Sequence, residues 1–289
     1  AYYEPTFSRR SHGFRPGRGC HTALREVAIT WTGTTWFLEG DISDCFSSLD
    51  HEVMIKILAE KIHDNRFLRL MRNMLTAGYL EDWHWNATLS GCPQGGVVSP
   101  VLSNIYLHNL DEYVEKVLIP QYTRGVARRC NPAYQGLRNR LAWARHRGDR
   151  VKARKLRRQM RTLPSRDPQD PEYRRLRYSR YADDHLLGFT GPKAEAEAIK
   201  AQLAQFLRDE LALELNAEKT LITHARTRAA RYLGYELIVQ HSDSKITNGR
   251  RSVNGTVALR VPLDVIKAKR APYRRHGKPW HRSAMQNLD

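Results

Sequence analysis

The chain has 289 residues, 41% of them hydrophobic, with 6 Trp, 13 Tyr and 7 Phe, which excludes an intrinsically disordered protein and allows one large or two ordinary domains. Its formal net charge of +18 and its pI near 10 indicate a polyanionic partner, most often nucleic acid, with an anionic membrane surface as the weaker alternative. No apolar run reaches the roughly 20 residues that a helix needs to span a bilayer.

The first half of the chain predicts one strand and two helices. Residues 35–42 have the pattern of a strand that ends on Asp41. A helix is expected after Asp50, whose side chain is a favourable N-cap, and a longer helix over 99–118 begins with a Ser-Pro pair.

A strongly basic segment lies between Arg124 and Arg177, with 18 Lys+Arg and 4 Asp+Glu. Two apolar stripes at helical spacing, separated by Gly148-Asp149, predict a helical hairpin. Because guanidinium groups suit phosphate oxygens and also stack on bases, this segment is predicted to bind a phosphate backbone; a merely solvated basic face is the alternative. The candidate RNA-binding residues are Arg154, Lys155, Arg157 and Arg158.

Residues 180–189 read RYADDHLLGF, which predicts two short strands with Asp183 and Asp184 at the turn between them. Because Asp is a favoured turn residue, an ordinary solvated turn is the alternative. A sheet containing this hairpin and the strand at 35–42 would bring Asp41 beside the two acids. Three converging carboxylates repel one another unless cations lie between them, and two Mg²⁺ ions about 3.5–4 Å apart meet this need in nucleotidyl transfer.

The rest of the chain predicts a helix from Pro192, a strand over 231–239 and a last basic helix from Pro262. Asn248-Gly249 and Asn254-Gly255 predict two tight hairpin turns. The order of elements predicts an α+β fold, with a small antiparallel sheet backed by helices. The four cysteines are far apart and contain no CxxC pair, as in an intracellular protein without a zinc or redox site. No signal peptide opens the chain, which begins at Ala1 and is expected to be a fragment or a processed product.

Several blocks of sequence resemble reverse transcriptases. Tyr181-Ala182-Asp183-Asp184 resembles their Tyr-x-Asp-Asp box, and GDISDCFSSLDH at 40–51 is similar to their first catalytic-aspartate motif. CPQGGVVSPVLSNIYLHNLD at 92–111 resembles the Pro-Gln-Gly block in the Gln-Gly-x-x-x-Ser-Pro form of group II intron-encoded enzymes. The other similar blocks are a fingers motif at 12–24, later palm blocks at 213–222 and 231–237, and thumb-entry (domain X) motifs at 252–262 and 276–282. The resemblance covers nearly the whole chain.

The resemblance implies the fingers and palm of a right-hand polymerase with a basic helical-hairpin insertion. The implied parts are fingers at 1–34, palm and fingers at 35–123, the basic insertion at 124–177, palm with the YADD hairpin and primer grip at 178–240, and hairpins with the start of the thumb at 241–289.

The resemblance also implies residue roles. Asp41, Asp183 and Asp184 would be catalytic and bind two Mg²⁺ ions together with Ile42. Phe46 would pack under the incoming sugar and exclude a 2′-OH, with Cys45 beside it as a substrate contact; core packing is the alternative for Phe46. Gln94 would contact the nucleotide and the template, with a polar turn residue as the alternative. Arg15 would bind the triphosphate, with Arg9 or Arg10 helping. Lys219 would be a general acid near the pyrophosphate, or else a helix-end surface lysine, and the primer grip would consist of Tyr232, Leu233 and Gly234, which could equally be core positions. His185 departs from the family pattern, in which an apolar residue is commoner.

The implied function is RNA-directed DNA synthesis, in which a primer 3′-OH attacks a dNTP and pyrophosphate leaves. The expected partners are template and intron RNA, a DNA primer and dNTP, without a membrane and with a possible homodimer, in the cytoplasm of a bacterial cell. Two alternatives remain open: an RNA-binding splicing cofactor with dispensable polymerase activity, and a CRISPR-linked reverse transcriptase of group II ancestry. The Gln-Gly-x-x-x-Ser-Pro form and the thumb-entry motif argue against a retron or diversity-generating enzyme.

Overall fold

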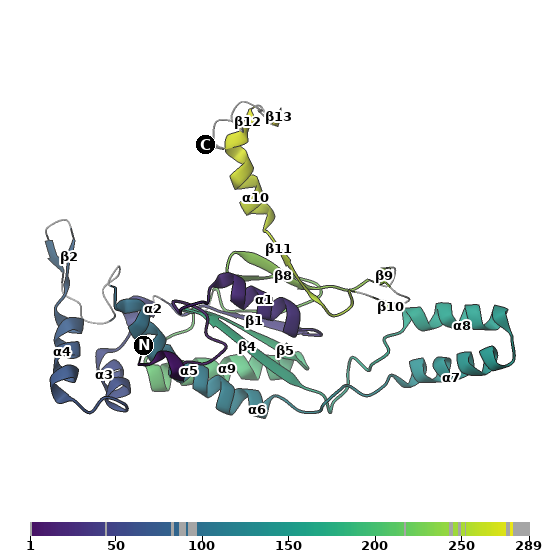
Figure 1. Ribbon diagram of the computed structural model, residues 1–289, viewed down its shortest axis with the longest axis horizontal. Helices are drawn as coiled ribbons and strands as arrows, with labels where there is room; N and C mark the ends of the chain where they lie inside the picture. The colour runs from purple at the N-terminus through teal and green to yellow at the C-terminus, as the bar shows by residue number, and fades with distance from the viewer. Residues whose placement is uncertain are drawn as a thin grey trace.

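The centre of the protein is a four-stranded antiparallel sheet in the order β4-β5-β1-β6 (Figure 1). The computed structural model describes residues 2–43, 45–81, 84–86, 91, 97–216, 218–242, 245–247, 250–251, 253–275 and 278–279. The sheet strands are β1 (Trp36–Gly40), β4 (Arg175–Tyr181), β5 (Asp184–Thr190) and β6 (Leu221–His224). Helices pack on this sheet, so the predicted α+β fold, with a small antiparallel sheet backed by helices, is confirmed.

The sheet is buried on both faces because alternate residues of its central strands are apolar on each side. Leu38 and Leu187 belong to a core with helices α3 (His51–Ala59), α5 (Ser99–Tyr113) and α9 (Lys193–Leu211). Phe37 and Leu186 belong to a second core on the other face. That core is completed by α1 (Cys20–Thr30) and a three-stranded sheet of β7 (Ala230–Tyr232), β8 (Tyr235–Val239) and β11 (Val257–Arg260).

Most predicted elements are present where local signals were strong. Asp50 caps α3, since its Oδ1 accepts a hydrogen bond of 2.9 Å from Val53 N. The helix predicted over 99–118 is α5 followed by a π-helical turn at Val114–Leu118 and by α6 (Ile119–Gln121). The helices α1, α2 (Cys45–Ser48) and α4 (Asn65–Thr76), the strand β6 and the short hairpin of β2 (Tyr79–Glu81) and β3 (His84–Asn86) were not predicted.

The single strand predicted over 231–239 is wrong. Leu233 and Gly234 have φ angles of 50° and 78°, and they form a two-residue turn between β7 and β8, in which Tyr232 pairs with Tyr235. Two successive residues with positive φ match the right-handed twist of a hairpin. The apolar pattern runs through this turn without a break, which hid it from a reading of periodicity.

The two Asn-Gly turns have different outcomes. Asn248-Gly249 lies outside the described residues, although β9 (Ile246–Thr247) and β10 (Arg250–Arg251) on either side of it are paired. Asn254-Gly255 is a turn, with Gly255 at φ 89°, but the strands that meet beside it are β8 and β11, not a hairpin pair joined by it. Beyond β11, Pro262 precedes α10 (Leu263–Arg270) as predicted.

The predicted basic helical hairpin is confirmed. Helices α7 (Pro132–His146) and α8 (Arg150–Thr162) project from the sheet (Figure 1). Leu141, Ala144 and Leu156 are buried between them. The chain enters and leaves along a neck in which Arg124 and Arg174 exchange backbone hydrogen bonds of 3.1 and 3.0 Å. In the described part of the chain, no helix is both long and apolar enough to cross a membrane.

Candidate active site

Asp183 and Asp184 lie at the tip of the hairpin that joins β4 to β5, as the sequence predicts. Tyr181 pairs with Asp184, which leaves Ala182 and Asp183 as the two turn residues. Ala182 has a φ of 56°, in the left-handed region that residues with a side chain seldom adopt. Strained backbone of this kind is concentrated at functional sites, where surrounding contacts hold it.

The strand register brings Asp41 to the same tip. Gly40 at the end of β1 pairs with His185 of β5, so the next residue, Asp41, lies opposite Asp184. Gly40 is required there, since a Cβ would lie 2.0 Å from His185 Nε2. His185 is buried, and burial lowers its pKa to about 4, so the ring is neutral at pH 7.

The three carboxylates influence one another. The pKa of Asp184 is raised to about 6, first by burial and then by the negative charges of Asp183 and Asp41. Lys219 Nζ lies 2.9 Å from Asp41 Oδ2, and this ion pair raises the pKa of Lys219. Lys219 lies in a turn before β6 and not at the end of a helix, so the helix-end location is wrong, whereas a surface lysine stays the alternative to the general acid.

The three acids fit a cation site in their chemistry but not in the geometry that they have in this structure. Oxygen ligands and excess negative charge are what Mg²⁺ needs, and the Lys219 ammonium already supplies positive charge at Asp41. Among the described residues, however, no group of three or more His, Cys, Asp or Glu side chains is arranged to hold a metal ion.

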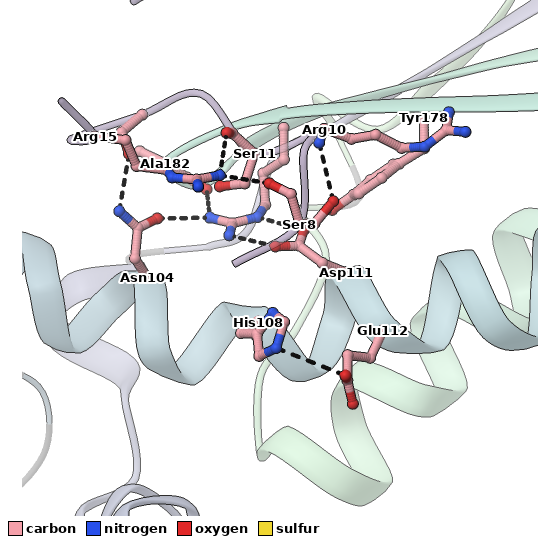
Figure 2. Close-up of polar contacts among 12 residues, drawn as sticks. Ser8, Arg10, Ser11, Arg15, Asn104, His108, Asp111, Glu112, Tyr178 and Ala182 are labelled. Carbon is pink, nitrogen blue, oxygen red and sulfur yellow. Dashed lines mark hydrogen bonds and ion pairs between the residues drawn. The ribbon is translucent and has the colours of Figure 1, made fainter. Parts of the chain in front are cut away.

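A buried ion pair supports the turn from behind. Arg180 and Asp111 are both fully buried, and two hydrogen bonds of 2.7 Å join them. Arg180 Nη1 also donates to Ala182 O at 2.8 Å and to Asn104 Oδ1 at 3.2 Å. Tyr178 donates to Asp111 at 2.8 Å. Figure 2 shows Asn104, Asp111, Tyr178 and Ala182 gathered at this point above α5. The network therefore ties the strained turn to the core.

The segment before α1 packs against the same turn. Arg180 N donates to Arg10 O at 2.9 Å, and His12 N donates to Arg180 O at 2.8 Å. Gly13 O accepts a hydrogen bond of 2.8 Å from Asn104. A Cβ on Gly13 would lie 2.3 Å from Ala182 N, so only glycine allows this approach.

Arg15, predicted to bind the triphosphate, is buried and turned inward in this structure. Its guanidinium forms an ion pair of 2.8 Å with Glu4 and donates to the backbone oxygens of Ser8 and Ser11. Arg10 pairs with Glu115 at 3.1 Å, whereas Arg9 is exposed. A triphosphate contact by Arg15 requires an exchange of these partners.

The residues after Asp41 have different environments. The side chains of Ile42 and Cys45 are both 2% exposed and belong to the core, so neither side chain is accessible to a substrate. Phe46 is half-buried and lies outside the cores; its ring is 6.2 Å from that of Phe14 in an edge-on arrangement. Phe14 in turn lies 6.4 Å from Tyr181. Gln94 lies outside the described residues.

The primer-grip and RNA-binding candidates are spread over different surroundings. Tyr232 is buried, with its hydroxyl 3.3 Å from Ser179 Oγ, whereas Leu233 is half-buried and Gly234 exposed in the turn. The four candidate RNA-binding residues of α8 (Arg154, Lys155, Arg157 and Arg158) are all exposed.

Residues 1–237 match the family described as reverse transcriptase (RNA-dependent DNA polymerase). The chain belongs to the reverse transcriptase family. It is 40% identical to the group II intron-encoded protein LtrA of Lactococcus lactis subsp. cremoris over 90% of this chain and 45% of that protein. It is 36% identical to an uncharacterized 91 kDa protein in the cob intron of Schizosaccharomyces pombe over 93% of this chain and 34% of that protein. A putative COX1/OXI3 intron 1 protein of Saccharomyces cerevisiae is 37% identical over 82% of this chain and 28% of that protein.

The predicted resemblance to group II intron-encoded reverse transcriptases is thus confirmed. The chain spans less than half the length of these three relatives. Within this reverse transcriptase domain, sequence reasoning missed Arg180, Asp111 and Asn104. Arg180 directly precedes the Tyr-x-Asp-Asp box, and a charged residue in a strand that is otherwise buried is a signal for a paired charge.

Proposed function

We propose that the chain is the catalytic part of a group II intron reverse transcriptase, which extends a DNA primer on an RNA template from dNTP. The observation that carries this proposal is the β1–β5 register, which sets Asp41 opposite Asp184 at the turn that holds Asp183. An ordinary solvated turn does not explain why a third carboxylate, Asp41, lies beside it. It also does not explain a buried neutral His185 with a glycine, Gly40, packed against its ring.

The residues would divide the work as follows. Asp41, Asp183 and Asp184, with the backbone of Ile42, would hold two Mg²⁺ ions; when bound, these would supply positive charge for the primer 3′-OH and the triphosphate. Lys219, whose Nζ lies 2.9 Å from Asp41 Oδ2, would move to the leaving pyrophosphate and donate a proton there. Phe46, with Phe14 beside it, would form the floor under the deoxyribose. Contacts of Gln94, Cys45 and Arg15 with the nucleotide, and of Tyr232, Leu233 and Gly234 with the primer, remain part of the proposal.

The domain roles are also proposed. Residues 1–34 would act as fingers, 35–123 and 178–240 as palm, and 241–289 as the entry to the thumb. The basic insertion at 124–177 would bind template or intron RNA. Its two helices leave most of their arginines exposed, a feature that favours phosphate contact over core packing.

The test is primer extension on an RNA template with dNTP and Mg²⁺. Asp183→Asn should abolish extension while RNA binding is retained, and chelation of Mg²⁺ should abolish it in the unaltered protein. Asp209→Asn is the matched control, because Asp209 is an exposed acid on α9, remote in sequence from the turn. Equal extension by the two variants would remove the catalytic role of Asp183.

The same experiment separates the second candidate, an RNA-binding splicing cofactor. The observation that favours it is the exposed arginine-rich hairpin, which is built as a unit apart from the acids. A protein that binds RNA tightly but extends no primer at any Mg²⁺ concentration would be this cofactor.

A further inference from the structure

A cleft of about 1090 Å³ lies between the basic hairpin and the side of the protein that carries the loop after α1. One wall is a stripe on α7, in which Tyr134, Arg138, Leu141 and Arg145 follow one another at helical spacing. The opposite wall includes Gly33 and the turn after β6. The cleft is therefore two-sided, and neither the hairpin nor the sheet forms it alone.

Among the described residues, the basic side chains that line this cleft are arginines, with His241 beside them. Six come from the hairpin and its neck: Arg128, Arg138, Arg145, Arg157, Arg161 and Arg166. A seventh, Arg226, comes from the opposite wall. Among the residues that the structure describes, no Asp or Glu lines the cleft, and none of the seven arginines forms an ion pair with a carboxylate.

Three of the four acids of the segment interact elsewhere. Asp149 caps α8 by accepting a hydrogen bond from Lys152 N at 2.9 Å. In the neck, Asp167 pairs with Arg129 at 2.7 Å, and Asp170 accepts from Arg129 N at 2.6 Å. In the described part of the chain the cleft arginines thus form no ion pair while they repel one another, and a bound polyanion relieves that repulsion.

The arrangement suits a chain of phosphates. From Tyr134 to Arg145 the stripe on α7 is about 16 Å long at 1.5 Å per residue, long enough to face several successive phosphates. Arg128 stacks on Tyr173 with its guanidinium 5.4 Å from the ring centre, so part of the wall is fixed in place. Guanidinium forks bind phosphate oxygens in pairs.

We infer that this cleft holds the backbone of helical RNA, with Arg157 and Arg161 of the hairpin and Arg226 of the sheet side on its two walls. The choice of RNA rests on the proposed function; the site itself rests on the arginines. Helical RNA is recognised mainly by shape and backbone, which agrees with a wall of guanidinium groups. Binding here refines the prediction for α8, because Arg157 lines the cleft and Arg154, Lys155 and Arg158 do not.

The cleft is separate from the acids. It opens near the start of β4, and the acid turn follows the end of that strand, six residues and roughly 20 Å further on. RNA in the cleft is therefore a second contact with the protein, beyond the primer and template at the acids.

The test uses two pairs of matched variants and a fluorescent RNA hairpin of about 16 base pairs, the length that a shape-reading domain spans. Arg157→Ala/Arg161→Ala removes two charges from the cleft face of α8, and Lys155→Ala/Arg158→Ala removes two from its other face. Arg226→Ala removes one charge from the far wall, and Arg228→Ala removes one from the same turn outside the cleft.

Affinity is measured by anisotropy over a range of salt concentrations. The Arg157/Arg161 variant should lose about tenfold or more in affinity and about 1.5 in the log–log salt slope, at 0.7–0.9 per phosphate contact. Arg226→Ala should lose about half as much slope. Both control variants should lose clearly less than their partners. Equal losses of affinity in each matched pair would refute RNA binding in the cleft, because any basic residue of the surface would then contribute equally.

Two further measurements identify the ligand of the cleft and separate this proposal from the proposed polymerase function. A DNA duplex of the same sequence and vesicles of anionic lipid should bind at least several-fold more weakly than RNA; equal binding of either overturns the RNA assignment. If the unaltered protein extends no primer but the matched pairs differ as expected, the proposed polymerase function fails and the cleft stands. If the unaltered protein extends the primer and the matched pairs do not differ, the polymerase function stands and the RNA-binding cleft fails.

Discussion

Replacing Asp111 should be one of the most damaging single changes in the chain. Asp111 and Arg180 are both fully buried and joined by two hydrogen bonds of 2.7 Å. Asp111→Ala leaves the Arg180 guanidinium buried with only Asn104 Oδ1 and Ala182 O as acceptors, and removes the acceptor of Tyr178. Removal of one partner from a buried pair costs about 3–5 kcal/mol, because the remaining charge stays desolvated.

The loss is measured as the free energy of unfolding in urea, with the slope against urea checked for constancy. Glu52→Ala is the control, since Glu52 and Arg72 form an ion pair of 2.9 Å between α3 and α4 with both side chains well exposed. Exposed pairs contribute little, so this variant should be close to the unaltered protein. If Asp111→Ala and Glu52→Ala lower the free energy of unfolding equally, the buried Asp111–Arg180 pair does not have the expected effect on stability.

A double variant separates stability from positioning. In Asp111→Leu/Arg180→Met no charge is left buried, and replacement of a buried pair by apolar residues is often neutral or stabilising. Its stability should therefore recover well above that of Asp111→Ala. The hydrogen bond from Arg180 to Ala182 O is still absent, so primer extension should stay low. Recovery of both stability and extension would show that Arg180 does not position the turn.

Three other changes test the site. Gly40→Ala should abolish primer extension and lower the urea midpoint of unfolding, because the added Cβ would lie 2.0 Å from the His185 ring. The control Gly136→Ala lies within α7, where the nearest atom is 3.9 Å away, and should raise the free energy of unfolding by about 0.5–1 kcal/mol. Phe46→Ala should raise the incorporation of rNTP relative to dNTP in a competition assay, and an unchanged ratio would return Phe46 to a packing role. Lys219→Gln should lower the rate of extension in single-turnover measurements with little effect on RNA affinity, and an unaltered rate would leave Lys219 as a surface partner of Asp41.

The acids were predictable because their signals are local. Asp183 and Asp184 interrupt an apolar stretch, and Asp41 ends a strand, so both patterns can be seen within about ten residues. Their meeting needed one further step, the assumption of a shared antiparallel sheet. The β1–β5 register supplies that step, with Gly40 opposite His185.

The supporting contacts were not predictable for the opposite reason. Arg180 and Asp111 are 69 residues apart, and any of many acids is an equally good partner on sequence alone. The inward turn of Arg15 likewise depends on Glu4, whose position is set by the packing of residues 3–7 on the core. The break at Leu233 was missed because tertiary pairing overrode a continuous apolar pattern.

Backbone strain explains why the site needs such support. Among the described residues four non-glycine positions have positive φ, and Ala212 is the C-cap of α9, where this is ordinary. Leu233 lies in the two-residue turn between β7 and β8, where positive φ is also ordinary. The other two lie at the acid turn: Ala182 within it, and Phe14 with its ring 6.4 Å from that of the neighbouring Tyr181. Such conformations cost about 1–3 kcal/mol each and persist only where contacts over-determine them. The hydrogen bond from the buried Arg180 to Ala182 O is a contact of that kind. Because the ion pair with Asp111 holds Arg180 in place, it also stabilises the acid turn in a conformation that the chain would not adopt by itself.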